Sequence, residues 1–233
     1  MGRSANMVDH VDIATMNSGS IIVINGASCA GKTTLARAIQ DLAIEPYIIL
    51  SLDQFRDSLP SRYRGLNSPQ GSSGAEGLNI VPITHDERVL TDIQFGPYGQ
   101  TVLRGMRRTI ATLAAEGLNV IVDDVILSSS FRDDYLQALR GLSVVFVGVH
   151  CTTEEMNRRE RMREGRFPGT AESTLAKVHL HMLYDVEVDA TNKSPTDLAQ
   201  EVLKCTRKPA LPNALERMWS LKAKSFEPSE SSD

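Results

Sequence analysis

The stretch from Gly26 to Thr33 reads Gly-Ala-Ser-Cys-Ala-Gly-Lys-Thr and fits the phosphate-binding pattern G-x-x-x-x-G-K-[ST]. Its glycines allow a tight turn that brings several backbone N–H groups against phosphate oxygens. The Lys32 ammonium can reach the terminal phosphates, and the Thr33 hydroxyl can bind Mg²⁺. The alternative is a chance glycine turn between a strand and a helix. The residues predicted to bind a nucleotide are Gly26, Ala27, Ser28, Cys29, Ala30, Gly31, Lys32, Thr33 and Thr34.

A carboxylate follows the apolar segment at residues 47–50, which we predict to be a parallel strand. Open α/β sheets bind their ligands at the carboxyl ends of such strands, so Asp53 is a candidate for a catalytic role. The alternative is that Asp53 caps a helix over residues 54–59, a position that suits aspartate. Both roles can hold together.

Two further carboxylates, Asp123 and Asp124, close the apolar strand predicted at residues 119–124. After a phosphate loop, such a strand commonly supplies an aspartate that orders Mg²⁺ or its water. The alternatives are helix capping or a salt bridge. Because neighbouring side chains on a strand point to opposite faces, we expect only one of the pair to serve the metal, together with Thr33.

A cluster of arginines follows Thr152 and Glu155, which fit a helix capping box. The cluster comprises Arg158, Arg159, Arg161, Arg163 and Arg166. Such a run usually marks a solvated helix face. Beside a phosphate loop we favour a lid over residues 152–170, whose guanidinium groups stabilise phosphate charge during transfer.

The remaining pattern predicts an α/β domain over residues 20–204, between a flexible leader at 1–19 and a tail at 205–233. The expected strands cover residues 21–24, 47–50, 119–124, 142–149 and 184–189. One helix is expected directly after the phosphate loop and another after Ser194. Further helices are expected at residues 98–116, 131–139 and 170–183, and a short one near 215–221. Residues 60–97 are rich in glycine and proline, and we expect them to be irregular, with a mobile loop at 68–74.

Composition excludes several classes of protein. The chain has 233 residues and a formal net charge of -4, so neither a nucleic acid nor a membrane is an expected partner. No apolar run approaches the ~20 residues that span a bilayer, and the first 17 residues do not fit a secretory signal. Three widely spaced cysteines indicate a reducing compartment without disulfides. We expect a cytoplasmic protein and leave a homo-oligomer open.

Taken in order, several segments resemble the chloramphenicol phosphotransferase family. They are Asn25 to Lys32, Ser51 to Asp53, Ile121 to Leu127, Val147 to Cys151, Arg159-Glu160, Arg163, Arg166 and, most discriminating, Tyr184 to Thr191. The resemblance implies a three-layer P-loop kinase fold, with a five-stranded parallel sheet flanked by helices and an arginine-bearing lid. It implies that Asp53 is the general base and that Arg159, Arg163 and Arg166 face the phosphates. Residues 60–97, which shape the acceptor pocket in the family, match poorly.

Three functions compete at this point. The first is a kinase that uses ATP and Mg²⁺ to phosphorylate a small-molecule alcohol, similar to chloramphenicol 3-O-phosphotransferase and able to inactivate an antibiotic. The second is a kinase of nucleotide sugars, similar to zeta toxins. The third is a non-catalytic, nucleotide-gated binding module that uses the segment around Trp219 for a partner. We favour the first, because a pure switch needs neither Asp53 nor a set of lid arginines.

Overall fold

The computed structural model describes residues 18–163 and 167–224, and its centre is a five-stranded parallel sheet. The strand order is β2-β6-β1-β7-β8. The strands are β1 (Ile21–Gly26), β2 (Tyr47–Ser51), β6 (Asn119–Asp124), β7 (Val144–His150) and β8 (Val186–Asp189). Every residue of β1 is buried, as expected for a central parallel strand covered on both faces, and this explains its almost uninterrupted Ile/Val sequence.

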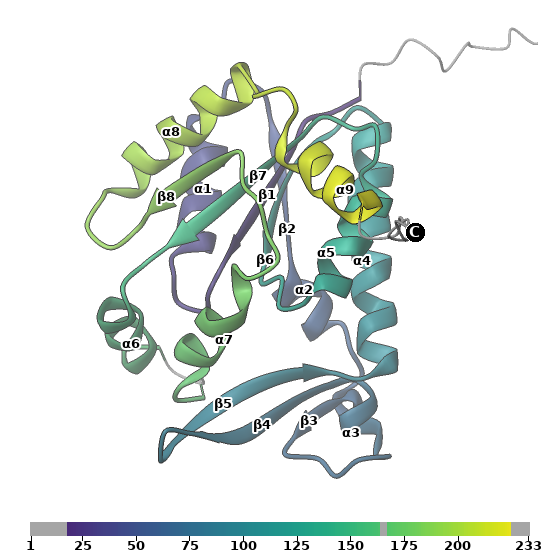
Figure 1. Ribbon diagram of the computed structural model, residues 1–233, viewed down its shortest axis with the longest axis vertical. Helices are drawn as coiled ribbons and strands as arrows, with labels where there is room; N and C mark the ends of the chain where they lie inside the picture. The colour runs from purple at the N-terminus through teal and green to yellow at the C-terminus, as the bar shows by residue number, and fades with distance from the viewer. Residues whose placement is uncertain (1–17, 164–166, 225–233) are drawn as a thin grey trace, which may run out of the picture.

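Helices cover both faces of this sheet (Figure 1). One layer holds α1 (Lys32–Leu42) and α8 (Pro195–Arg207), and the other holds α4 (Pro97–Ala115), α5 (Ser129–Ala138) and α9 (Ala214–Lys224). The predicted three-layer fold with a five-stranded parallel sheet is therefore confirmed. Within residues 18–163 and 167–224, no helix combines the length and the apolar character that crossing a bilayer requires.

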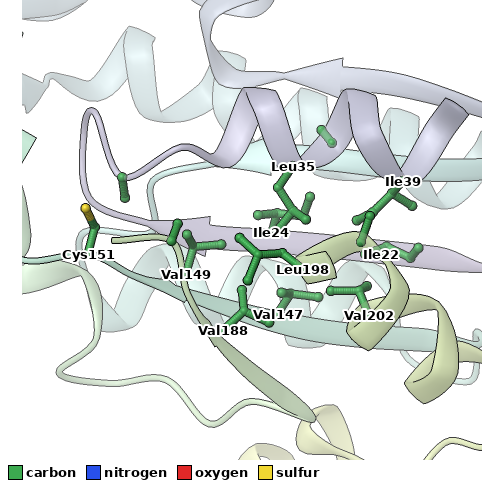
Figure 2. Close-up of a cluster of buried hydrophobic side chains, with 14 of the residues drawn as sticks. Ile22, Ile24, Leu35, Ile39, Val147, Val149, Cys151, Val188, Leu198 and Val202 are labelled. Atoms are coloured by element: carbon green, nitrogen blue, oxygen red, sulfur yellow. The ribbon is translucent and has the colours of Figure 1, made fainter. Parts of the chain in front are cut away.

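The core between α1, α8 and the sheet fixes the phosphate loop, residues 26–33, at the end of β1. Figure 2 shows this cluster, and its labelled side chains include Ile22, Ile24, Leu35, Ile39, Val147, Leu198 and Val202. All of them are at most 3% exposed. Burying each such aliphatic side chain contributes about 1.5–3 kcal/mol, so the loop is attached to a strand and a helix that are both firmly held.

The region at residues 60–97 is folded, and the expectation that it is irregular is wrong. α2 (Leu52–Asp57) precedes this region, whose own elements are η2 (Ser61–Tyr63), β3 (Arg64–Leu66), α3 (Ser73–Glu76), β4 (Leu78–His85) and β5 (Arg88–Phe95). The three strands form the insertion sheet, in the order β3-β4-β5, and β4 and β5 pair antiparallel. β3 pairs only with residues 78–80, so at Pro82 one edge of β4 has no strand partner among the described residues, and proline is tolerated there.

Two helices complete the chain next to the phosphate loop: α6 (Thr153–Arg161) and α7 (Thr170–Val178). The helix predicted over 170–183 ends early, at Val178, whose carbonyl accepts a hydrogen bond from the Asn25 side chain. The predicted short helix in the tail is present as α9 and packs its Leu215 and Met218 into the core. The leader up to residue 17 and the end of the tail from residue 225 lie outside the described residues.

Candidate active site

A cavity of about 1010 Å³ lies at the carboxyl end of the parallel sheet, between the phosphate loop, α6 and the insertion sheet. Three of the polar side chains predicted to do chemistry, Lys32, Asp53 and Asp123, line it together. They come from α1, α2 and β6, which are far apart in the sequence. The edge of the sheet therefore brings together the groups that the sequence indicated separately, as expected for open α/β folds.

The phosphate loop has the backbone conformation of an anion-binding turn. Gly31 has φ of 104° and Cys29 has φ of 62°, both in the left-handed region, and α1 begins directly after them at Lys32. A Cβ atom on Gly26 would lie 2.6 Å from the Val149 carbonyl oxygen, so only glycine fits at the first motif position. The loop thus presents backbone N–H groups at a helix N-terminus, where an anion is stabilised.

The Lys32 side chain is buried beside the loop, and its Nζ donates a hydrogen bond to the Ala27 carbonyl at 2.8 Å. Burial lowers the pKa of the Lys32 ammonium, while nearby carboxylates, Asp123 first, act in the opposite direction. Phosphate oxygens placed in the loop would supply further negative charge. The position therefore suits a lysine that neutralises the terminal phosphates of a nucleotide.

The two neighbouring aspartates at the end of β6 face opposite sides, as predicted. Asp123 lines the cavity and accepts a hydrogen bond from the Thr33 hydroxyl at 2.5 Å. Asp124 is 0% exposed and accepts hydrogen bonds from the Tyr135 hydroxyl and the Val125 N–H, both at 2.6 Å. The geometry therefore favours Asp123 over Asp124 as the partner of Thr33 at a metal ion.

The residues around Asp123 fit Mg²⁺ better than a metal held in an all-protein cage. In the described part of the chain, no group of three or more His, Cys, Asp or Glu residues could hold a metal ion. Mg²⁺ is usually bound by one or two protein ligands, with water and substrate phosphates completing its shell. The pair of Thr33 and Asp123, next to the phosphate loop, is such a partial set.

Asp53 is placed by α2, but it does not cap that helix. The N-cap is Ser51, which forms a capping box with Gln54, so the structure excludes the alternative that Asp53 caps this helix. Asp53 instead lies in the first turn and lines the cavity, with 48% of its side chain exposed. Arg56 donates to its Oδ1 at 2.7 Å and is itself held by two hydrogen bonds to Asp57 at 2.9 and 3.0 Å.

The arginines of α6 have different surroundings. Thr152 caps the helix, and Glu155 pairs with Arg158 and Arg159, whose hydrogen bonds lower the pKa of this carboxyl to about 2, Arg158 contributing most. Arg159 also reaches backbone carbonyls of the phosphate loop. Arg163 is exposed and lines the cavity. Arg166 lies outside the described residues.

Two residues for which the sequence predicted no role of their own hold the phosphate loop. The Asn25 side chain is fully buried, accepts from the Ile126 N–H at 2.8 Å and donates to the Tyr184 hydroxyl at 2.8 Å. The Thr174 hydroxyl of α7 accepts from the Ser28 N–H at 3.0 Å. A buried asparagine at the end of an apolar strand is a signal that could have pointed to Asn25, because buried polar groups must be hydrogen-bonded. No local signal marks Thr174.

The far end of the cavity is mostly apolar. Its wall comes largely from the insertion sheet and includes Leu66, Leu78, Ile80, Ile93 and Phe95. Arg56 and Arg64 also line this end. Arg62 instead lies over the Tyr63 ring, and the Tyr63 ring packs against that of Tyr98. The cavity thus combines a polar, phosphate-binding end with an apolar end.

Comparisons with known proteins agree with this geometry. Residues 19–207 match the family described as "Chloramphenicol phosphotransferase-like protein". A protein of Mycobacterium tuberculosis named "Putative O-phosphotransferase Rv2636" is 32% identical over 216 residues, covering 88% of this chain and 90% of the relative.

Solved structures show the same fold at lower identity. The M. tuberculosis APS kinase CysC, in complex with AMPPNP and APS, has a TM-score of 0.55 at 17% identity and covers 82% of this chain and 99% of its own. A gluconokinase from Sinorhizobium meliloti has a TM-score of 0.50 at 21% identity, with coverage of 91% and 99%. These structures show the fold; the match of residues 19–207 and the 32% identical relative show that the chain belongs to the chloramphenicol phosphotransferase-like family.

Proposed function

We propose that this protein transfers the γ-phosphate of ATP to a hydroxyl group of a small molecule. The observation that supports the proposal most strongly is that Asp53 shares one cavity with the phosphate loop, Lys32 and Asp123. A protein that only bound nucleotides would need the loop and the metal-side carboxylate. It would not need a second carboxylate, that of Asp53 after β2, in the same cavity.

In this proposal the phosphate loop binds the nucleotide phosphates through its N–H groups and the Lys32 ammonium. The Thr33 hydroxyl and the Asp123 carboxylate hold Mg²⁺, which neutralises charge on the phosphates when it is bound. Arg163, which is exposed and lines the cavity, adds positive charge beside the γ-phosphate. These groups stabilise the charge that spreads over the transferred phosphoryl group, which is where phosphoryl-transfer catalysis mostly lies.

Asp53 would act on the acceptor. The acceptor hydroxyl lies between the Asp53 carboxylate and the γ-phosphorus, and its proton passes to Asp53 as the oxygen forms a bond to phosphorus. The bond between the γ-phosphorus and the bridging oxygen breaks, and ADP leaves. Arg56 fixes the Asp53 carboxylate in the cavity through its hydrogen bond at 2.7 Å.

The apolar end of the cavity indicates the kind of acceptor. A polyol or a sugar acid would need hydrogen-bonding partners along its length, and burying its hydroxyls against Leu78, Ile80 and Ile93 would leave them unsatisfied. An alcohol with an apolar body fits better. Chloramphenicol, with its aryl ring and primary hydroxyl, is such a molecule, so we include the inactivation of this kind of antibiotic in the proposal.

The two competing functions are less well supported. A nucleotide sugar is polar along its whole length and finds few partners on the insertion sheet. A partner-binding role for the segment around Trp219 is disfavoured, because α9 packs onto α5 and β7, and the Trp219 ring stacks against Arg140 at 4.9 Å. Growth arrest on expression would favour the toxin-like function over the one proposed here.

The test is a screen of hydroxylated antibiotics and metabolites, including chloramphenicol and gluconate, for acceptor-dependent release of ADP. With an acceptor found, Asp53→Asn should retain ATP binding and lose at least about 100-fold in kcat, as expected for loss of a general base. Lys32→Ala should weaken ATP binding itself. Full transfer by Asp53→Asn would exclude Asp53 as the base, and ATP binding unaffected by Lys32→Ala would place the nucleotide elsewhere.

A further inference from the structure

One guanidinium group from α6, at the nucleotide end of the cavity, holds the phosphate loop. Nη1 of Arg159 donates to the Ala30 carbonyl oxygen at 3.2 Å and to the Cys29 carbonyl oxygen at 3.4 Å. Nη2 donates to the Ala190 carbonyl oxygen at 2.7 Å. Arg159 therefore joins α6 to two segments that flank the nucleotide end of the cavity, the phosphate loop and the turn after β8.

The backbone of the loop explains why these carbonyls need a donor. A loop that turns its N–H groups inward, towards an anion, turns carbonyl groups outward. Here Cys29 and Gly31 adopt left-handed conformations, and the carbonyls of Cys29 and Ala30 point to the same guanidinium. Two adjacent carbonyl oxygens repel one another, so a cation that binds both stabilises the peptide orientations that the inward N–H groups require.

Arg159 is itself fixed in this position. Its Nε donates to Oε1 of Glu155 at 2.8 Å, one turn earlier on α6. All three nitrogens of the guanidinium are thus engaged by protein acceptors, and the side chain is 27% exposed. Arg159 and Arg163 both line the cavity, but Arg163 is exposed, whereas the Arg159 guanidinium is already bound to protein acceptors.

We infer that Arg159 is a positioning residue, which keeps the phosphate loop in its anion-binding conformation and acts on the nucleotide through the loop backbone. This differs from the direct contact with the transferred phosphate that the family resemblance implied for Arg159. The inference rests on the proposed binding of nucleotide at the phosphate loop, and it is independent of the acceptor.

The two roles predict different nucleotide preferences. A guanidinium that contacts the γ-phosphate strengthens the binding of ATP and leaves ADP almost unaffected. A guanidinium that shapes the loop affects every ligand whose β-phosphate the loop binds, so ATP and ADP are weakened by the same factor. The ratio of the two dissociation constants therefore separates the roles, and no acceptor is needed to measure it.

The experiment is a calorimetric titration of the full-length protein and its variants with ATP and with ADP, in the presence of Mg²⁺. Arg159→Gln should weaken both nucleotides by about 10- to 100-fold, the range expected when charge-assisted hydrogen bonds are lost, and by factors that agree within about threefold. Arg159→Lys keeps the charge but cannot reach the separate carbonyls at once, so it should restore only part of the affinity. Arg37→Gln removes a charge from an exposed position on α1, away from the cavity lining, and should change affinity less than twofold.

Three results would overturn the inference. They are unchanged affinities in Arg159→Gln, a loss confined to ATP, or full restoration by Arg159→Lys. If Arg159→Gln does not fold, Glu155→Gln carries the test, since it leaves Arg159 in place and removes the charge that orients it. Both nucleotides should then weaken equally, about threefold or more, and no change would count against the inference.

A failure of the proposed function is distinguishable in the same titrations. If the wild-type protein and Lys32→Ala bind ATP equally, the phosphate loop is not the nucleotide site, and both proposals fail. If Lys32→Ala loses binding while Arg159→Gln keeps it, only the positioning role fails.

Discussion

Asp123 and Asp124 are adjacent in sequence, yet the structure predicts opposite consequences when each loses its charge. Asp123 lies at the cavity with the Thr33 hydroxyl as its partner. Asp124 lies behind it at 0% exposure, with Arg107, also at 0%, 3.7 Å away. The variants Asp123→Asn and Asp124→Asn therefore affect two adjacent residues in different surroundings. The first removes a charge from a binding site, and the second removes a charge from the core.

The magnitude for Asp124→Asn follows from the burial of its partner. Removing one member of a buried ion pair leaves the other charge uncompensated and costs about 3–5 kcal/mol. Two features place the expected loss of stability of this variant at the lower end of that range. First, Arg107 retains its ion pair with Asp134, at 3.2 Å. Second, an asparagine oxygen at position 124 can still accept the hydrogen bond that the Tyr135 hydroxyl donates to Asp124 at 2.6 Å. We expect a loss of about 3 kcal/mol in the free energy of unfolding, a large share of the roughly 5–15 kcal/mol of a typical domain.

Asp123→Asn should change stability by only about 1 kcal/mol, because its hydrogen-bond partner is a neutral hydroxyl at the edge of a cavity, and the buried Lys32 ammonium keeps Asp124 and Asp53 as further nearby carboxylates. It should instead remove most of the effect of Mg²⁺ on nucleotide binding. A carboxylate is the stronger ligand for this ion, and Thr33 alone supplies no negative charge. We expect ATP affinity in Mg²⁺ to fall at least about 10-fold and ADP affinity in EDTA to stay unchanged.

Urea unfolding measures the first effect, and calorimetric titration with and without Mg²⁺ measures the second. If Asp124→Asn is as stable as the wild-type protein, the reasoning from the buried pair with Arg107 is refuted. If Asp124→Asn loses the Mg²⁺ effect and Asp123→Asn keeps it, the two faces of β6 have been assigned the wrong way round.

Two further predictions concern the stability of the protein at acid pH and the apolar wall of the cavity. Burial beside His150 lowers the pKa of His179 to about 4, so between about pH 6.5 and 4 the unfolded chain takes up a proton that the folded chain does not, and stability falls as the pH drops through this window. After allowance for its partial exposure, His179→Asn should reduce the difference between the free energies of unfolding at pH 7 and pH 4.5 by about 1–2 kcal/mol, as measured by urea unfolding. In the apolar wall, Ile80→Ser should raise the KM for an apolar alcohol about 10-fold without changing ATP affinity in steady-state assays, and an unchanged KM would place the acceptor elsewhere.

The elements around the phosphate loop could be predicted because each carries its own local signal. The sequence shows a run of buried Ile and Val, then a glycine-rich turn, then an apolar stripe at helical spacing. This pattern predicts a strand, a loop and a helix without information from the rest of the chain. The insertion sheet gives no such signal. Pro82 interrupts the β4 pattern, and what holds β5 in place lies in another part of the chain. Lys177 of α7 donates to Asp92 at 2.6 Å, and the Thr91 hydroxyl donates to the Pro168 carbonyl at 2.7 Å.

The same limit applies within the site. The residue types that contact a nucleotide were predictable from a motif, whereas the residues that hold the motif in shape act over 100 or more positions of sequence. One consequence is that α7 contacts both ends of the cavity. Its Thr174 accepts from Ser28 in the phosphate loop, and its Lys177 binds Asp92 of β5, the strand whose Ile93 and Phe95 line the apolar end of the cavity. α7 therefore connects the insertion sheet to the phosphate loop through two side-chain hydrogen bonds. This connection could not be predicted from the sequence, because neither contact leaves a local pattern.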